Sequence, residues 1–199
     1  MLEVVAITNR ALAATNYWDQ VEKIAAADID YLVLREKTLT EDEYTEYAKR
    51  ALRLCNIHQK TCILQHFGKA AIRLHVPRFQ CSLPYLETHS SLLFYMTTLG
   101  VSVHSAAEAK KAQELGATYI MASHVFPTAC KPKDPPIGVE ELKKICQTVS
   151  LPVYALGGIT PQTIGQLKDV PIKGVALMSG LMTCTDLAGY IQELRANIQ

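Results

Sequence analysis

The chain has 199 residues, which at roughly 100–200 residues per domain predicts a single domain spanning 1–199. Hydrophobic residues make up 49% and charged residues 20%, proportions that argue against a disordered chain, a coiled coil or a collagen-like repeat. Lys and Arg number 20 and Asp and Glu 19, so no field of one sign favours nucleic acid or an anionic membrane. We therefore expect a small molecule as the partner.

Cysteine and histidine spacing gives no sign of a disulfide framework or a metal centre. The 6 cysteines form no C-x-x-C pair, and no charged-then-apolar signal peptide opens the sequence. The 6 histidines form no H-x-H or H-E-x-x-H pair. No apolar run approaches the roughly 18–20 residues that span a bilayer. We expect reduced thiols, no metal site and a cytoplasmic location without a membrane partner.

Short apolar or β-branched runs recur along the whole chain and predict strands. They are near-continuous rather than alternating, which is typical of a parallel sheet covered on both faces. In chain order the runs are Val4–Thr8, Tyr31–Arg35, Thr61–Gln65, Ile72–Val76, a run ending near Val103, Tyr119–Ser123, Pro152–Leu156 and Gly174–Met178.

Helix start signals lie between these runs. Thr40 with Glu43 and Ser105 with Glu108 fit capping boxes, and Thr160 followed by Pro161 places a capping hydroxyl before a first-turn proline. Alternating strands and helices predict an α/β fold, either a closed (β/α)8 TIM barrel or a long open sheet. We favour the barrel, with units of only about 25 residues. The weakest signals lie between residues 69 and 100, where we expect a truncated helical layer.

Glycine turns follow the last two predicted strands. Glycines let backbone N–H groups approach an anion, and barrels commonly bind phosphate after strands seven and eight. Gly157, Gly158, Ser179 and Gly180 are therefore the candidate phosphate site. The alternative is that the glycines only make tight turns.

Titratable residues follow other strands, where a barrel places its reacting groups. His124 is the acid/base candidate, because imidazole suits proton transfer near neutral pH; the alternative is a histidine hydrogen-bonded within the rim. His104 has the same two alternatives, with the structural one favoured. Arg35 and Lys37 alternate along a strand end, which aims two cations at a carboxylate or phosphate. Glu36 is expected to face away, into a surface ion pair.

Several motifs in order resemble the thiamine phosphate synthase superfamily of small (β/α)8 barrels. They are Leu-Arg-Glu-Lys at 34–37, Gly-Val-Ser-Val-His at 100–104, Phe-Pro-Thr-x-x-Lys at 126–131, Ala-Leu-Gly-Gly-Ile at 155–159 and Gly-Val-Ala-x-Met-Ser-Gly at 174–180. The resemblance spans nearly the whole chain and implies a phosphorylated thiazole as the ligand.

Two branches of that superfamily differ in their chemistry. The synthase branch joins a pyrimidine diphosphate to a thiazole phosphate with magnesium, and resembles an enzyme with Asn-Asp after strand three and a further acid after strand four. Here the first position reads Gln65-His66, and no aspartate lies between Pro77 and Glu87. Magnesium prefers oxygen ligands, usually including one or two carboxylates. These departures count against the synthase, so magnesium is expected only if that alternative holds.

The thiazole tautomerase branch is more similar. Ser123-His124-Val125-Phe126 resembles its Gly-His-Val-Phe motif, and Met178-Ser179-Gly180 resembles its last turn. The resemblance implies that His124 aromatises a dehydrothiazole carboxylate phosphate by proton transfer, without a cofactor. Ser102 and His104 at the end of the fifth predicted strand, and Thr128 and Lys131 in the loop after the sixth, are the expected substrate contacts.

Three functions thus stay open from the sequence: a tautomerase, which we favour; a divergent synthase; and a non-catalytic regulatory protein that binds thiazole phosphates. Conversion, magnesium-dependent coupling and binding without conversion distinguish them. The oligomeric state also stays open, with a homodimer as one alternative.

Overall fold

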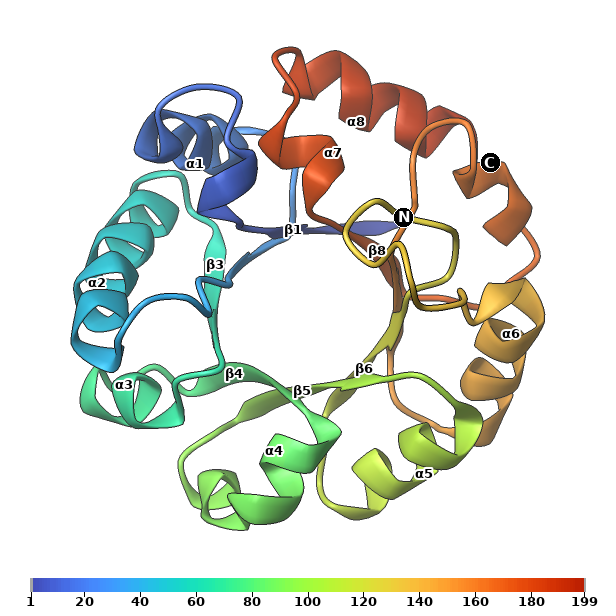
Figure 1. Ribbon diagram of the computed structural model, residues 1–199, viewed down its shortest axis with the longest axis horizontal. Coiled ribbons are helices and arrows are strands. Elements are labelled where there is room, and N and C mark those ends of the chain that lie inside the picture. The colour runs from blue at the N-terminus through green and yellow to red at the C-terminus, as the bar shows by residue number, and fades with distance from the viewer. Residues whose placement is uncertain (1, 199) are drawn as a thin grey trace.

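The computed structural model describes residues 2–198, and its strands form a closed parallel barrel. Consecutive strands pair in order, and the last closes on the first through pairs such as Val5 with Ala176 (Figure 1). The strands are β1 (Glu3–Ile7), β2 (Tyr31–Leu34), β3 (Thr61–Gln65), β4 (Arg78–Ser82), β5 (Thr98–Val103), β6 (Tyr119–Ser123), β7 (Val153–Leu156) and β8 (Gly174–Leu177). The predicted (β/α)8 barrel is confirmed.

Helices form a ring around the strands (Figure 1). The α-helices are α1 (Tyr17–Ala26), α2 (Glu41–Ile57), α3 (Gly68–Arg73), α4 (Leu83–Thr88), α5 (Ala106–Glu114), α6 (Gly138–Thr148), α7 (Ser179–Met182) and α8 (Leu187–Ala196). Three short 3-10 helices are η1 (Arg10–Leu12), η2 (Ser90–Phe94) and η3 (Ile164–Leu167). Helix α3 and helix α4 have only six residues each, so the expected truncation of this layer is confirmed.

Two of the three predicted helix starts are confirmed. Thr40 and Glu43 form the reciprocal capping box of α2, and the Ser105 hydroxyl accepts from the Glu108 amide at the start of α5. The predicted start at Thr160-Pro161 is wrong. The Thr160 amide donates to the Thr163 hydroxyl, which donates to the Gly158 carbonyl at 2.9 Å, so this segment closes a local turn before η3 begins.

The strand predicted at Ile72–Val76 is also wrong. Ile72 lies in α3, and the fourth strand comes six residues later, at Arg78–Ser82. Only Phe79 and Cys81 give β4 an apolar signal, because the residue between them, Gln80, is polar. Gln80 is nevertheless fully buried inside the barrel, where its amide nitrogen donates to the Ser102 hydroxyl of β5 at 2.9 Å. A buried polar side chain with its own partner thus hid the strand.

The buried core has two parts, one on each side of the barrel wall. The inner part comprises Val5, Ile7, Val33, Ile63, Tyr119, Met121, Tyr154 and Ala176. A larger outer cluster lies between strands and helices and includes Leu32, Leu34 and Leu64. Burial on both faces explains the near-continuous apolar runs of the sequence. Among residues 2–198, no helix has the length and hydropathy to cross a bilayer.

Candidate functional site

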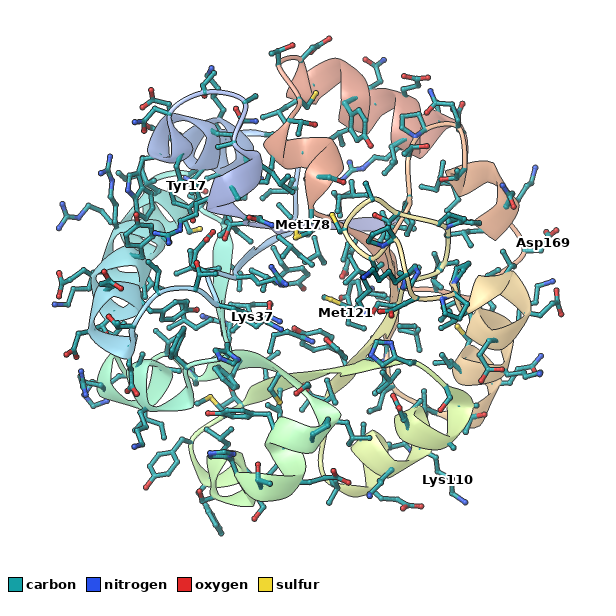
Figure 2. All side chains as sticks on the ribbon, viewed as in Figure 1. Tyr17, Lys37, Lys110, Met121, Asp169 and Met178 are labelled. Atoms are coloured by element: carbon teal, nitrogen blue, oxygen red, sulfur yellow. The ribbon has the colours of Figure 1, made fainter. Side chains whose placement is uncertain are left out.

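A cavity of about 630 Å³ opens at the carboxyl ends of the strands. In Figure 2 the labelled Lys37, Met121 and Met178 lie within the ring of strands, whereas Lys110 and Asp169 lie at the outer edge of the molecule. All eleven residues predicted for the site line this cavity: Arg35, Lys37, Ser102, His104, His124, Thr128, Lys131, Gly157, Gly158, Ser179 and Gly180. The fold brings them together, while their individual roles remain predictions.

His124 directly follows β6 and packs against the turn after β7. Its side chain is only 4% exposed. A Cβ atom added at Gly157 would lie 2.2 Å from the His124 Cβ, and the φ angle of Gly157 is +100°. Only glycine satisfies both the contact and the backbone conformation. The Nε2 of His124 is buried and has no hydrogen-bond partner within the described residues, so the rim does not tie up this nitrogen.

Gly158 is required for packing in the same way. A Cβ there would lie 2.5 Å from the Pro127 carbonyl oxygen. The turn-making role of these two glycines therefore has a direct structural basis, and phosphate binding by them stays a prediction. Ser179 and Gly180 form the start of α7, directly after β8, and line the same side of the cavity.

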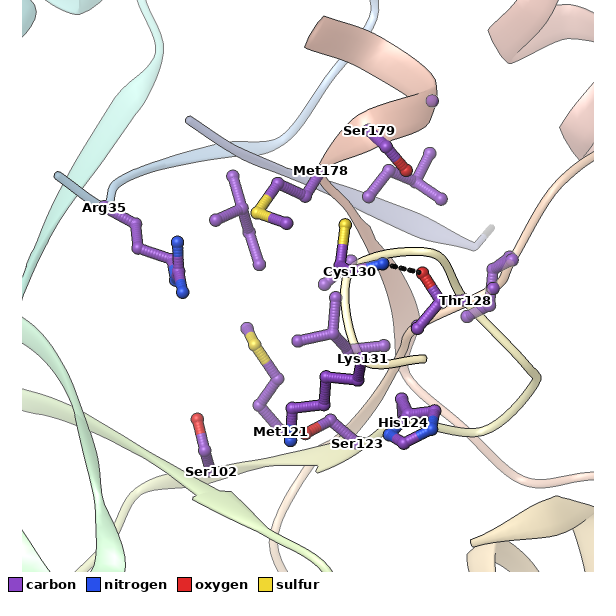
Figure 3. Close-up of a pocket in the computed structure, with 18 of the residues that line it drawn as sticks. Arg35, Ser102, Met121, Ser123, His124, Thr128, Cys130, Lys131, Met178 and Ser179 are labelled. Atoms are coloured by element: carbon purple, nitrogen blue, oxygen red, sulfur yellow. Dashed lines mark hydrogen bonds between the residues drawn. The ribbon is translucent and has the colours of Figure 1, made fainter. Parts of the chain in front are cut away.

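The loop between β6 and α6 carries Thr128, Cys130 and Lys131 over the cavity (Figure 3). The Thr128 hydroxyl accepts from the Cys130 amide at 3.3 Å, and the Thr128 carbonyl accepts from the Lys131 amide at 3.1 Å. Thr128 thus holds the loop in a turn. Figure 3 shows Arg35 entering from β2 and Lys131 entering from this loop.

The surface ion pair predicted for Glu36 is wrong, because none of the ion pairs in residues 2–198 involves its carboxylate. Glu36 does face away from the cavity, but its carboxylate is buried, with 3% exposure. It accepts hydrogen bonds from the Thr8 hydroxyl at 2.9 Å, the Tyr17 hydroxyl at 3.0 Å and the Arg10 amide at 3.2 Å. The Thr8 hydroxyl in turn accepts from the Arg35 amide at 3.0 Å. Glu36 therefore anchors the segment that carries Arg35 and Lys37.

Arg35, Lys37 and His66 form a group that we call the cationic corner. Burial first, then Arg35 and Lys131, lower the pKa of Lys37. Burial first, then Lys37 and Arg35, lower the pKa of His66. Of the aspartates and glutamates in residues 2–198, none lines the cavity. Positive charge without a carboxylate to balance it suits an anionic ligand.

His104 and Ser102 each have a protein partner as well as a place on the cavity wall. The Nδ1 of His104 lies 2.5 Å from the Ser123 carbonyl oxygen, so this nitrogen carries the hydrogen and donates. The structural alternative for His104 thus matches its contact, and only Nε2 is left for a ligand. Ser102 accepts from Gln80, which orients its hydroxyl.

The sequence model described as thiamine monophosphate synthase matches residues 4–181, nearly the whole barrel. The chain belongs to this family. Membership places it among the enzymes of thiamine biosynthesis.

Named relatives of this family member cover most of the chain. It is 30% identical over 197 residues to thiamine-phosphate synthase 2 of Streptococcus pneumoniae, covering 96% of this chain and 92% of the relative. It is 33% identical to a putative thiamine-phosphate synthase 2 of Aquifex aeolicus, covering 80% and 86%. The solved thiamine phosphate pyrophosphorylase from Pyrococcus furiosus superposes with a TM-score of 0.85 at 26% identity, covering 99% and 95%.

Magnesium does not fit the residues found in this member of the thiamine monophosphate synthase family. The corrected fourth strand ends at Ser82, so the two positions at issue hold Gln65-His66 and Ser82-Leu83. Neither offers a carboxylate, and no group of three or more His, Cys, Asp or Glu within the described chain is arranged to hold a metal ion. The usual carboxylate ligands of magnesium are missing from this cavity.

Among the cavity residues that the sequence prediction did not name, Tyr85 and His66 are the most informative. Tyr85 lines the wall, and its hydroxyl accepts from the Gly68 amide at 3.2 Å. It lies three residues after the true end of β4, so a correct fourth strand would have pointed to it. His66 follows β3 directly, but strand alternation turns that position away from the barrel interior. The positive φ angle that turns its side chain into the cavity has no signature in the sequence.

Proposed function

We propose that this family member is a thiazole tautomerase that aromatises a dehydrothiazole carboxylate phosphate. The observation that carries the proposal is His124, held against Gly157 on the wall of a cationic cavity with Nε2 unpaired. An unpaired buried nitrogen costs free energy, and a catalytic role is one reason for a protein to keep one. The acid/base histidine of the sequence prediction thus has a matching environment.

The proposed reaction needs only proton transfers. His124 takes a proton from a ring carbon of the substrate, and the electron pair shifts toward the exocyclic double bond. A proton then returns to the exocyclic carbon, so the ring becomes aromatic and the overall composition is unchanged. Arg35 and Lys37 hold the substrate carboxylate and offset charge on the intermediate, while the turns at Gly158 and Ser179 hold the phosphate. Fixing both ends places the ring beside His124.

The test is an NMR assay of ring aromatisation with and without a chelator. We expect chelator-insensitive turnover that falls by about 10²–10⁴-fold in His124→Ala, the usual contribution of an acid/base group. His89→Ala is the matched control, because His89 is an exposed histidine that does not line the cavity, and it should keep full turnover. Full activity of His124→Ala would overturn the assignment.

A divergent thiamine-phosphate synthase is the second candidate, and the names of the relatives favour it. It predicts that the pyrimidine diphosphate and the thiazole phosphate are joined when magnesium is present. The missing carboxylates at Gln65-His66 and Ser82 stand against it. Incubation of both substrates with magnesium decides: formation of thiamine phosphate would favour the synthase over the tautomerase.

Binding without either conversion would instead identify the regulatory alternative, with thiazole phosphates raising the melting temperature. In all three cases the proposed partner is a small phosphorylated thiazole. A cytoplasmic location is part of the proposal, because the six cysteines are free thiols, which suits a reducing compartment.

A further inference from the structure

His66 occupies the cavity because its backbone breaks the alternation of β3. Ile63 lies in the inner core and Leu64 in the outer cluster, and Gln65 lines the cavity, so alternation would send His66 outward. The φ angle of His66 is +77°, in the left-handed region that residues other than glycine rarely adopt. His66 nevertheless lines the cavity. Such strain at a non-glycine residue is typical of functional sites.

The imidazole of His66 is free to bind a ligand. It is exposed, and its ring nitrogens have no hydrogen-bond partner within residues 2–198. Its protein contacts are aromatic: an edge contact with Phe67 at 4.8 Å between ring centroids and a wider one with Tyr85 at 6.3 Å. The charged groups that act on it are Lys37 and Arg35, both cationic.

We propose that His66 is a specificity-determining residue that binds the substrate carboxylate together with Arg35 and Lys37, and that it takes up a proton as this anion binds. The inference rests on the proposed thiazole carboxylate phosphate as substrate. Burial is the first cause of the lowered pKa of His66, and the two neighbouring cations, Lys37 and Arg35, add to it by disfavouring a third positive charge. An anion placed among them reverses that effect, so the imidazolium forms and donates a charge-assisted hydrogen bond.

This role gives a function to Gln65-His66, the pair that stands where the synthase branch has Asn-Asp. An acidic residue here would repel a carboxylate. A histidine that becomes protonated as the ligand binds instead attracts it. The site then discriminates between a thiazole phosphate with a ring carboxylate and one without it. The phosphate end contributes equally to both ligands, so the difference between them isolates the cationic corner.

Calorimetric titration in buffers of different ionisation enthalpy measures the proton taken up. The two probes are the aromatic thiazole carboxylate phosphate and the same thiazole phosphate without the carboxylate, which corrects for any protons exchanged by the phosphate group. We expect proton uptake near neutral pH with the first probe only. In His66→Gln that uptake disappears, and affinity for the carboxylate probe falls about tenfold, the scale of one charge-assisted hydrogen bond, with the other probe unaffected.

His75→Gln is the matched control. His75 is also exposed and also has a positive φ angle, +54°, but it follows α3 and does not line the cavity. It should behave like the unmodified protein. Unchanged proton uptake in His66→Gln, or an equal loss of affinity for both probes, would overturn the inference.

A second probe separates this inference from the proposed function. Pyrophosphate carries closely spaced anionic groups but no thiazole, and an NMR titration of the His66 ring follows its protonation directly. If neither thiazole probe binds but pyrophosphate raises the pKa of His66, the anion site stands and the proposed function falls. If no probe changes the pKa of His66, the inference itself fails.

Discussion

His124 and His66 line one cavity, yet the surroundings of the two histidines differ. His124 is buried and fixed by close packing, because the Gly157 backbone leaves no room for a Cβ beside it. His66 is exposed, its φ angle of +77° sets its place in the cavity, and its charged neighbours are Lys37 and Arg35. The proposed proton-transfer group is thus held by close packing, whereas the proposed anion-binding group is open to the cavity beside two cations. Substitutions that change volume should therefore impair the function of His124, and substitutions that change charge should impair that of His66.

Gly157→Ala should have the largest effect. The added methyl group meets His124 and the residue keeps a positive φ angle, so we expect the free energy of unfolding to fall by about 3 kcal/mol. Turnover should fall by about 100-fold as His124 is displaced. Urea unfolding and the NMR assay measure the two losses.

Gly138→Ala separates strain from crowding. Gly138 also has a positive φ angle, +75°, but a Cβ there meets nothing within 4 Å. We expect a loss of about 1 kcal/mol and normal turnover. Equal effects of the two substitutions would show that packing does not fix His124.

Glu36→Gln tests the anchor of the cationic corner. The amide group of glutamine would set an N–H donor against one of the three donors that now bond to Glu36. We therefore expect the free energy of unfolding to fall by about 2 kcal/mol and KM to rise. Glu46→Gln is the control, because Glu46 forms only an exposed pair with Lys49 and should change stability by less than about 0.5 kcal/mol. Similar losses in both variants would contradict the anchoring role.

Lys131→Ala should weaken substrate binding at the loop between β6 and α6. Loss of one charged contact to an anion should raise KM about tenfold, with little change in stability. Lys133→Ala is the control: Lys133 belongs to the same loop and is exposed, but it does not line the cavity. Equal KM values for the two variants would remove Lys131 from the binding site.

The smallest effect concerns the protonation of Lys37. Burial lowers the pKa of Lys37 most, and Arg35 and then Lys131 lower it further, so Lys131→Met should raise this pKa and Arg35→Met should raise it more. The ammonium charge then persists to higher pH. Carbon NMR of the lysine side chain follows this titration, with Lys133→Met as the neutral comparison. A pKa of Lys37 that falls or stays constant in both cavity variants would show that the cations do not interact.

The sequence predicts the barrel well where strands are apolar on both faces, and it fails where a polar residue points inward. Gln80 conceals β4 because it is a buried polar residue whose amide nitrogen donates to Ser102, a partner 22 positions away in the chain. Glu36 looks like a surface residue for the same reason: its partners Thr8 and Tyr17 come from β1 and α1. Such contacts form only in the folded chain, so the hydrophobic periodicity of the sequence does not predict them.

The candidate site shows the same division. Position after a strand identifies His124, Arg35 and Lys37, because barrel topology brings strand ends together. It gives no hint that Gly157 approaches His124 so closely, or that the φ angle of His66 turns its ring inward. Local backbone conformation depends on neighbours that the sequence order does not reveal.

Tyr44 of α2 is fully buried, and its hydroxyl donates to the Leu34 carbonyl of β2 and accepts from the Gln65 amide of β3, both at 2.8 Å. One phenol therefore sits between the two strands from which Arg35, Lys37 and His66 emerge. The spacing of those side chains is set from the helical layer, by a residue that does not line the cavity. A substitution in α2 is therefore expected to change which anions the proposed site accepts while leaving every cavity-lining side chain in place.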